Sequence, residues 1–311
     1  MKIISIVTPC YNEEKNIEAL YHAVKNELSN FPQYEYEHIF IDNASTDKTV
    51  QILKCIAQND KRLKIIINTR NFGHIRSPFY AMLQAKGDAV IMMAADFQDP
   101  PSLIPEFISK WEQGYQIVIG VREKSQEFFF MSWIRNLFYL IIKKISEDVP
   151  QIPNYHGFGL YSRKVVDILK SIPDPNPYFR GLICEIGFEH FVVKYNREKR
   201  KSGKSKNNLY TLYDIAMLGI INYSKLPLRV SVFIGFIIAI ISLAVSLFYL
   251  IYKLVFWERF IVGNAPIVIG LFFLGAVQLI SIGIIGEYVG AIFTFVKQRP
   301  LVIEKERINF D

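Results

Sequence analysis

Hydrophobic and polar positions alternate in long blocks along the first 122 residues. Apolar runs of strand length occupy residues 2–8, 35–42, 63–68, 89–95 and 117–121. Segments with helical spacing of apolar positions occupy residues 16–28, 48–57 and 74–85. Strands that alternate with helices of this length predict an α/β fold with a doubly wound, largely parallel sheet.

A cluster of polar residues follows each of the first four predicted strands. The clusters lie at residues 9–14, 42–47, 70–74 and 96–99. Loops at one edge of a parallel sheet converge in space, so four clusters in register predict one site, although any one of them alone is typical of an ordinary loop. The chain has no G-x-G-x-x-G after its first strand and no Walker A lysine motif, which disfavours a dinucleotide-binding dehydrogenase and a P-loop NTPase.

Two carboxylates, Asp96 and Asp99, end the fourth apolar run just before Pro100 and Pro101. Mg²⁺ takes oxygen ligands and bridges to substrate phosphates, so these acids are candidate metal ligands for a phosphate-bearing donor. The alternative is that Asp99 caps the next helix and Asp96 is a solvated loop acid.

The C-terminal third contains two long uncharged segments, residues 230–252 and 260–286. Each is long enough to cross about 30 Å of hydrocarbon, which takes about 20 residues. We therefore predict a soluble domain over residues 1–225, a transmembrane hairpin over 226–298 with spans at about 230–253 and 264–290, and a tail at 299–311. Buried core helices are the alternative for the two spans.

The distribution of lysine and arginine predicts the orientation of that hairpin. Both flanks are basic, over residues 197–229 and 297–307, and the positive-inside rule assigns them to the cytoplasm. We expect a multi-pass protein of the inner (plasma) membrane with its catalytic domain in the cytoplasm. Glycines in the second span would let helices approach closely, which is compatible with a homo-oligomer.

Three further segments are candidates for contact with the membrane or with phosphate groups. Residues 126–146 and 210–224 are candidate amphipathic helices at the membrane interface, and a buried helix is the alternative for the first. The basic run at 197–206 is either a flexible lid that closes on a diphosphate or a solvated loop that attracts anionic headgroups.

Composition narrows the picture in two ways. The chain is 51% hydrophobic and has a net charge of +7, which indicates a membrane part and an anionic partner without choosing between nucleotide, lipid and nucleic acid. Its three cysteines are far apart and lack metal-ligand spacing, which is typical of a reducing compartment.

Motifs along the whole chain resemble glycosyltransferase family 2, specifically the polyprenyl-phosphate glycosyltransferases of the dolichol-phosphate-mannose synthase and GtrB type. The matching segments are TPCYNEE (8–14), IDNASTDKT (41–49), RNFGH (70–74), GVR (120–122), RGL (180–182), GKSK (203–206), LPLR (226–229) and GEYVG (286–290). Several of these segments are weak signals individually, but their order and spacing together are a strong signal.

The resemblance implies a GT-A-type fold and inverting transfer of a hexose, from a UDP-linked donor to undecaprenyl phosphate, with Mg²⁺ or Mn²⁺ and no nucleic-acid partner. It implies catalytic residues Asp96, Asp99 and Arg122, with Asp96 as the metal ligand. It implies donor-binding residues Pro9, Tyr11, Glu13, Asp42, Ser45, Arg70, Asn71, Gly73 and Asp96. It implies phosphate-binding residues Arg122, Arg200 and Lys206, and acceptor-side residues Arg135, His156, Arg180 and Glu185.

The chain departs from the family pattern in three segments. The usual D-A-D-L-Q-D-P-P is AADFQDPP at residues 94–101, so the first acid is Ala94. The usual G-D-F-R-L is HGFGL at 156–160, so another acid is Gly157 and an arginine is Gly159, and Glu185 replaces a tryptophan in the third segment. A phosphate acceptor is already ionised and needs no strong base, whereas a sugar hydroxyl needs one. Transfer to a saccharide hydroxyl and a catalytically inactive membrane scaffold are the alternatives.

Overall fold

The structure is a computed structural model that describes residues 1–123, 152–196, 217–221, 224–256 and 264–310. The chain forms two compact units. The first contains Met1–Gly219 together with Lys297–Asp311, and the second contains Ile220–Val296.

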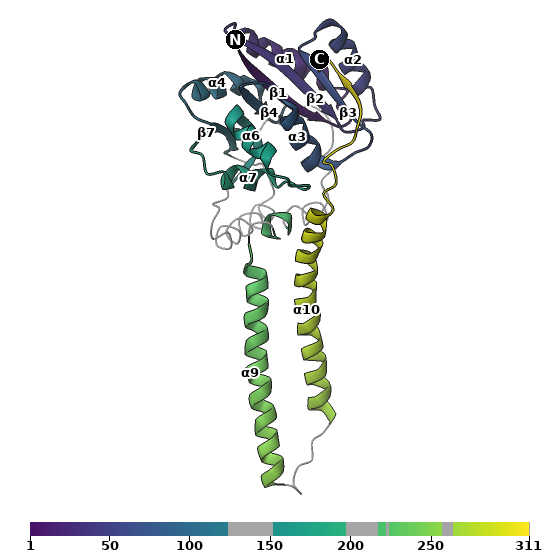
Figure 1. Cartoon of the computed structure of the whole chain (residues 1–311), viewed down its shortest axis with the longest axis vertical. Coiled ribbons are helices and arrows are strands. Elements are labelled where there is room, and N and C mark those ends of the chain that lie inside the picture. Colours follow the sequence, from purple (N-terminus) through teal and green to yellow (C-terminus); the bar gives the residue numbers. More distant parts are fainter. Residues whose placement is uncertain (124–151, 197–216, 222–223, 257–263, 311) are drawn as a thin grey trace. The chain divides into compact units, whose positions relative to one another are not determined.

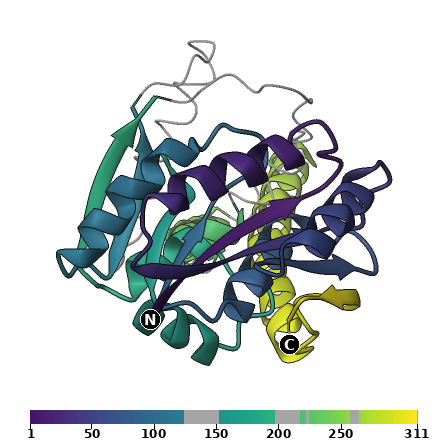
Figure 2. The same ribbon diagram turned by 90° about the horizontal axis from the view of Figure 1, so that it is seen from above.

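The first unit is built on one eight-stranded sheet (Figures 1 and 2). Its strands are β1 (Lys2–Cys10), β2 (Tyr34–Asp42), β3 (Leu63–Asn68), β4 (Ala89–Met92), β5 (Ile117–Arg122), β6 (Tyr155–Ser162), β7 (His190–Tyr195) and β8 (Glu304–Ile308). The strand order is β7-β5-β6-β4-β1-β2-β3-β8, and only β6 and β8 run antiparallel to their neighbours. The predicted largely parallel α/β sheet is confirmed.

Helices cover both faces of this sheet. Those packed on one face are α1 (Ile17–Ser29), α2 (Thr49–Asn59) and α4 (Ile104–Glu112), the last preceded by the short 3-10 helix η1 (Pro101–Leu103). Those packed on the other are α3 (Gly73–Gln84), α6 (Arg163–Ser171) and α7 (Phe179–Glu185). Successive strand residues point to opposite faces, so Ile65 and Ile67 pack in the first layer while Ile66 packs in the second. Both faces are buried, which is why the central strands are almost wholly apolar.

The C-terminal segment is part of the sheet. The sequence pattern predicts a tail at residues 299–311, but residues 304–308 form β8 and pair with β3. The sequence of this strand, EKERI, has almost no apolar pattern because it is an edge strand, where charged side chains face solvent. Asn309 fixes its end by donating hydrogen bonds to the carbonyl oxygens of Ala57 (3.0 Å) and Leu63 (2.9 Å).

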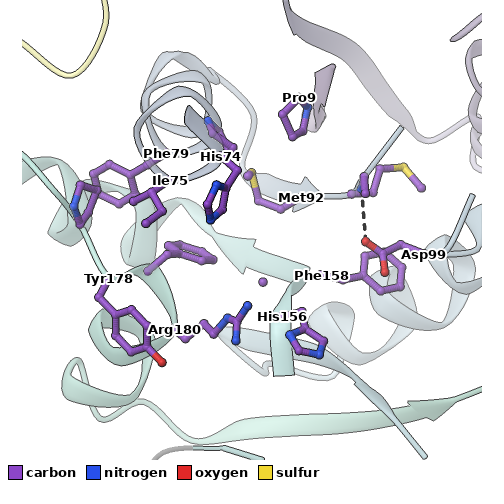
Figure 3. Close-up of a pocket in the computed structure, with 16 residues that line it drawn as sticks. Pro9, His74, Ile75, Phe79, Met92, Asp99, His156, Phe158, Tyr178 and Arg180 are labelled. Carbon is purple, nitrogen blue, oxygen red and sulfur yellow. Dashed lines mark hydrogen bonds between the residues drawn. The ribbon is translucent and has the colours of Figure 1, made fainter. Parts of the chain in front are cut away.

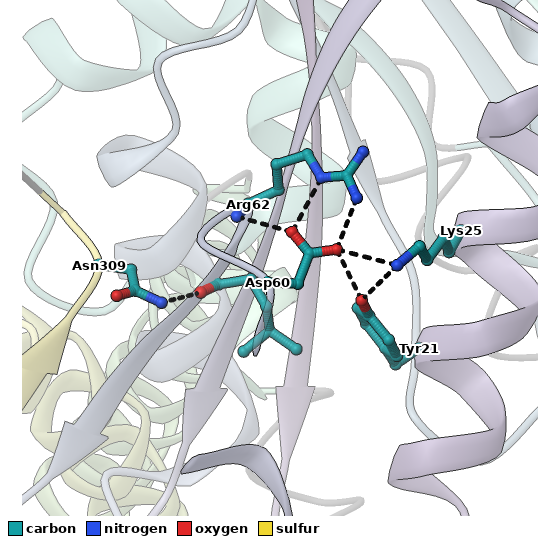
Figure 4. Close-up of polar contacts among 6 residues, drawn as sticks. Tyr21, Lys25, Asp60, Arg62 and Asn309 are labelled. Carbon is teal, nitrogen blue, oxygen red and sulfur yellow. Dashed lines mark hydrogen bonds and ion pairs between the residues drawn. The ribbon is translucent and has the colours of Figure 1, made fainter. Parts of the chain in front are cut away.

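A polar cluster around Asp60 joins α1, α2 and β3 at the sheet edge opposite the strand-end loops (Figure 4). The Asp60 carboxylate accepts hydrogen bonds from Tyr21 Oη (2.7 Å), Lys25 Nζ (3.1 Å) and Arg62 Nη2 (2.7 Å). These donors, Arg62 first, hold the pKa of Asp60 well below its usual range. Asp60 is buried, whereas Lys25 and Arg62 are partly exposed. The buried carboxylate thus connects side chains from three elements.

The second unit contains two long helices, α9 (Leu226–Val255) and α10 (Asn264–Val296). The stretches Leu226–Val255 and Gly270–Val296 contain 18-residue windows with mean hydropathies of 2.7 and 1.9, and by length and composition both are candidate membrane spans. Their large apolar side chains are exposed, so the buried-core alternative is wrong for the described residues. Tyr288 Oη donates a hydrogen bond to the Ser224 carbonyl (2.7 Å) and ties α10 to the residues before α9.

Candidate functional site

The loops that follow β1 and β2 are joined by hydrogen bonds. The Asn12 N–H donates to Ser45 Oγ and the Glu13 N–H donates to Thr49 Oγ1, both at 2.8 Å. In return the Thr46 N–H donates to Asn12 Oδ1 at 2.7 Å. The predicted donor-binding residues Glu13 and Ser45 therefore lie in adjacent loops at the carboxyl ends of neighbouring parallel strands.

Asp42 is the buried acid of this pair of loops. Its side chain is fully buried at the end of β2, and its Oδ2 accepts a hydrogen bond from the Ser45 N–H at 2.9 Å. Burial raises the pKa of Asp42, and the hydrogen bonds from Ser45 oppose that rise.

Asn43 links the loop after β2 to the loop after β3. Its Nδ2 donates to Asn71 Oδ1 (2.9 Å) and to the Gly73 carbonyl (3.0 Å), and its Oδ1 accepts from the Phe72 N–H (2.8 Å). Three of the four predicted clusters thus form one connected rim. Arg70, in the third of them, is exposed and its guanidinium lies over the Phe72 ring.

The fourth cluster begins with a tight turn, and β4 ends at Met92, three residues before the predicted end. Phe97 adopts a left-handed backbone conformation with φ of 59°, and the Gln98 N–H donates to Asp96 Oδ1 at 3.2 Å. Asp96 is only 7% exposed, so the alternative of a solvated loop acid is wrong.

Asp99 is the centre of a buried network. Its Oδ1 accepts hydrogen bonds from Tyr195 Oη (2.8 Å) and Arg122 Nη2 (3.2 Å), and its Oδ2 accepts from the Ala94 N–H (3.3 Å). Arg122 Nε also donates to Tyr195 Oη at 3.0 Å. The helix-cap alternative for Asp99 is wrong, because neither η1 nor α4 has a side-chain cap. Instead Asp99 orients Arg122 at the end of β5.

A pocket of about 220 Å³ opens beside Ala94 and Asp99 (Figure 3). Much of its wall is apolar and includes Phe79, Met92, Phe158 and Phe179. The titratable residues that line it are His74, Asp99, His156, Tyr178 and Arg180. The predicted acceptor-side residues His156 and Arg180 therefore face the same cavity, whereas Glu185 is exposed and is not among the lining residues.

The two missing acids belong to this pocket as well. Ala94 and Gly157, which stand where the family pattern has aspartates, both line it. Gly157 has φ of +98°, and its carbonyl accepts a hydrogen bond from Tyr161 Oη at 2.9 Å. A β-carbon there would make only ordinary van der Waals contact with the Phe179 ring, at 3.4 Å, so it is the left-handed backbone that favours glycine at this position.

Other predicted residues lie in the rim or outside the described part of the chain. Pro9 lines the pocket, and Tyr11, Asn71 and Gly73 lie in the first and third loops. Arg135, Arg200 and Lys206 lie outside the described residues, as do most of the two predicted amphipathic segments.

Two residues that shape the site, Tyr195 and Asn43, are not predicted from the sequence. Tyr195 lies on β7, where the alternation of exposed and buried residues indicates a strand but does not indicate a role in the site. Asn43 lies within a recognised motif, but its bridging role depends on a loop that is distant in sequence.

Comparison with known proteins decides the family. The model for "Glycosyl transferase family 2" matches residues 5–169, which include all four strand-end clusters. The chain belongs to glycosyltransferase family 2. It is 38% identical to an uncharacterized glycosyltransferase of Synechocystis sp. over 96% of this chain and 94% of that protein. It is also 37% identical to the SfII prophage-derived bactoprenol glucosyl transferase of Shigella flexneri, over 97% of each chain.

Solved structures agree on the fold of this glycosyltransferase. Glucosyl-3-phosphoglycerate synthase from Mycobacterium tuberculosis, in complex with phosphoglyceric acid, aligns with a TM-score of 0.50 over 71% of this chain and 78% of that one. The two sequences are 17% identical, so this likeness concerns the fold alone. The GT-A-type sheet expected from the resemblance is confirmed.

The described residues offer limited protein ligands for a metal ion. Among them no group of three or more His, Cys, Asp or Glu side chains could hold one. Asp99 is already paired with Arg122, which leaves the Asp96 carboxylate as the predicted ligand. Mg²⁺ commonly uses one or two carboxylates together with substrate phosphates and water. The residues present therefore fit a cation held jointly with the donor's diphosphate.

Proposed function

We propose that this glycosyltransferase moves a hexose from a UDP-linked donor to a polyprenyl phosphate at the cytoplasmic face of the inner membrane. The observation that carries the proposal is the chemistry of the pocket. Asp99 is its one acid among the described lining residues, and both of its oxygens already accept hydrogen bonds. The described pocket thus offers no uncommitted carboxylate to deprotonate an acceptor, and a phosphate acceptor needs no deprotonation.

The bond changes balance without a proton transfer. A phosphate oxygen of the acceptor forms a bond to the anomeric carbon, and the bond from that carbon to the UDP oxygen breaks. The acceptor changes from a dianionic monoester to a monoanionic diester, and UDP leaves with the additional negative charge. Displacement from the opposite side inverts the anomeric centre.

The main catalytic requirement is then to stabilise charge on the departing diphosphate. Fixed positive groups directed at developing charge are worth several kcal/mol in a site that excludes water. We assign this role to Arg122, held by Asp99 and Tyr195, with Arg200 and Lys206 as further candidates. Mg²⁺ or Mn²⁺, held by Asp96, would supply Lewis-acid stabilisation of the same group when bound.

The rim formed by the first three loops would hold the nucleotide. Asp42 would read the base, and Pro9, Tyr11, Glu13, Ser45, Arg70, Asn71 and Gly73 would surround the nucleoside and its phosphates. The connected hydrogen bonds around Asn43 support this assignment, because loops that are already ordered lose little conformational entropy when the donor binds.

The two candidate membrane spans support a lipid acceptor. The two candidate spans have lengths and hydropathies suited to a bilayer, and the relatives named as bactoprenol glucosyl transferases match this chain over 97% of its length, spans included. A catalytic unit anchored beside the bilayer would meet a polyprenyl phosphate at the surface where its headgroup lies.

Transfer to a saccharide hydroxyl is the second candidate. It is favoured by His74 and His156, which line the pocket, because an imidazole is able to accept a hydroxyl proton. The two candidates differ in the acceptor group they require.

Purified full-length protein in lipid nanodiscs tests the choice. We expect label from UDP-hexose to enter undecaprenyl phosphate but neither undecaprenol nor an oligosaccharide. Transfer to either hydroxyl acceptor at a comparable rate would contradict the proposal and favour the second candidate.

A further inference from the structure

Two tyrosines of β6, Tyr155 and Tyr161, form a buried pair that reaches the pocket wall. Neither side chain is exposed to solvent. Their hydroxyl groups are joined by a hydrogen bond, and Tyr161 Oη also bonds to the Gly157 carbonyl at 2.9 Å. A carbonyl oxygen only accepts, so Tyr161 donates its single proton to Gly157, and Tyr155 is the donor within the pair. The hydrogen bonds therefore run in one direction, from Tyr155 through Tyr161 to the backbone of Gly157.

Burial keeps both phenols protonated. It raises the pKa of Tyr155 and the pKa of Tyr161 above the usual tyrosine range. Neither hydroxyl therefore acts as a base at neutral pH, and the pair acts through its hydrogen bonds. In a low-dielectric interior an unpaired polar group is costly, so these bonds hold the Gly157 carbonyl in one orientation.

The segment that Tyr161 holds is an irregular stretch of β6. Pairing with β5 shifts register between Ile119 and Val121, so two steps along β5 correspond to four along β6. Residues 156–158 have no register partner on the described β4 and β5. Bulges of this kind redirect side chains and are common beside active sites. The Tyr161 hydroxyl thus takes the place of a strand partner for the Gly157 carbonyl.

This irregular stretch forms part of the pocket wall. His156, Gly157 and Phe158 all line the pocket (Figure 3). Gly157 has φ of +98°, so the chain turns sharply there. A hydrogen bond from Tyr161 to the carbonyl of this residue fixes the turn, and with it the directions of the two neighbouring side chains.

The Tyr161 ring supports a second wall of the pocket. It packs edge-on against the Phe179 ring with centroids 5.2 Å apart, and Phe179 in turn packs against Phe79 at 6.2 Å. Both phenylalanines line the pocket. A β-carbon at Gly159 would lie 3.3 Å from Tyr161 Oη and 2.5 Å from the Val118 carbonyl oxygen. A side chain at Gly159, where the family pattern has an arginine, would therefore crowd this hydroxyl.

Resting on the proposed function, we propose that Tyr161 is a positioning residue for sugar transfer. Its hydroxyl holds the Gly157 carbonyl and so fixes the turn of residues 156–158, while its ring supports Phe179. A misplacement of about 1 Å in an active site costs about 100-fold in rate, so partial release of this turn should lower kcat by about 10-fold. UDP binding should change little, because the hydrogen-bonded rim after β1, β2 and β3 contains none of these residues.

Two phenylalanine variants of the full-length protein in nanodiscs separate positioning from stability. Tyr161→Phe removes the bond to Gly157, whereas Tyr155→Phe removes the other buried hydroxyl and leaves that bond in place. Both variants should lose stability, so rates are measured well below both thermal midpoints, where each variant is folded. We expect kcat with undecaprenyl phosphate to fall about 10-fold in Tyr161→Phe and at most about three-fold in Tyr155→Phe. The Kd for UDP, measured by calorimetry, should stay within about two-fold of the parent in both, since neither hydroxyl belongs to the rim.

Amide hydrogen exchange gives a second readout that needs no acceptor. Exchange in residues 156–159 should be faster in Tyr161→Phe than in Tyr155→Phe, because only the first variant releases the Gly157 carbonyl. Equal exchange in the two variants would show that the hydroxyl of Tyr161 does not fix the turn.

Two kinetic results would overturn the positioning role. One is an equal kcat in the two variants, and the other is a loss in Tyr161→Phe that lies in the affinity for UDP. If Tyr161→Phe does not fold, Gly157→Ala, which strains the same turn, should lower kcat in the same way, and a parent-like kcat would overturn the role. If the parent transfers sugar to undecaprenyl phosphate and Tyr161→Phe behaves like Tyr155→Phe, the positioning role is wrong while the proposed function stands.

Discussion

Replacing Asp99 with asparagine tests whether this acid organises the site or acts on the substrate. Arg122 and Asp99 form an ion pair in which the side chains are only 14% and 8% exposed. Removing one partner of a buried pair leaves the other charge uncompensated and typically costs 3–5 kcal/mol. Asparagine keeps an oxygen that can accept the Tyr195 hydrogen bond, so we expect the lower end, about 3 kcal/mol.

The assay is thermal unfolding of full-length Asp99→Asn in one detergent, paired with initial rates. At about 2–4 °C per kcal/mol for a unit of this size, the midpoint should fall by about 6–12 °C. The kcat should fall as well, because Arg122 loses the carboxylate that orients it. Tyr195→Phe removes one hydrogen bond to the same carboxylate and should cost about 1.5–3 kcal/mol.

Tyr34→Phe is the matched control for the tyrosine change. Tyr34 Oη also donates to a carboxylate, that of Glu112 at 2.7 Å, but this contact is exposed and should be worth about 1 kcal/mol or less. An Asp99→Asn variant with unchanged stability and abolished turnover would refute this reasoning. That result would show that Asp99 acts directly on the substrate.

Three further outcomes are expected. The folded protein holds the pKa of Asp60 below its unfolded value, so the Asp60 cluster stabilises the fold above about pH 4 and loses that contribution as the pH falls. In Asp60→Asn the free energy of unfolding, measured by denaturant titration, should therefore fall less steeply as the pH is lowered below about 4. Asn309→Ala removes the two hydrogen bonds to backbone carbonyls that fix β8 and a third, exposed one from Lys61, and should lower the free energy of unfolding by about 1–3 kcal/mol, with faster amide exchange in β3; unchanged exchange would contradict the anchoring role. Chelation of divalent cations should abolish transfer by the parent protein. Asp96→Ala should reduce transfer and raise the Mg²⁺ concentration needed for the half-maximal rate, and full turnover by this variant would exclude Asp96 as the metal ligand.

The sequence was informative wherever a periodic pattern coincided with burial. The first five strands were predicted to within a few residues, because central strands covered on both faces are continuous apolar runs. The strand-end loops were predicted for the same reason, since parallel topology brings them to one edge. Their hydrogen-bond connections, such as Asn43 to Asn71, join residues 28 apart and leave no local signal.

The edges of the sheet and the pocket were harder to predict. β8 has a charged sequence because an edge strand needs no buried alternation, so the sequence pattern predicts a tail there and no strand. The role of Asp99 depends on Arg122 and Tyr195, which lie 23 and 96 residues away. The resemblance identified Ala94 and Gly157 as departures, but only the fold shows that both face one cavity with Arg180.

The most direct test of the central claim is the acceptor dependence of sugar transfer. Purified full-length protein in nanodiscs would be given labelled UDP-hexoses, Mg²⁺ and undecaprenyl phosphate, and the lipid fraction would be analysed for a hexosyl phosphodiester. The account predicts an acid-labile lipid-linked hexose that forms only when the lipid carries its phosphate. A protein that binds UDP, yet forms no such product with any common nucleotide sugar, would contradict it.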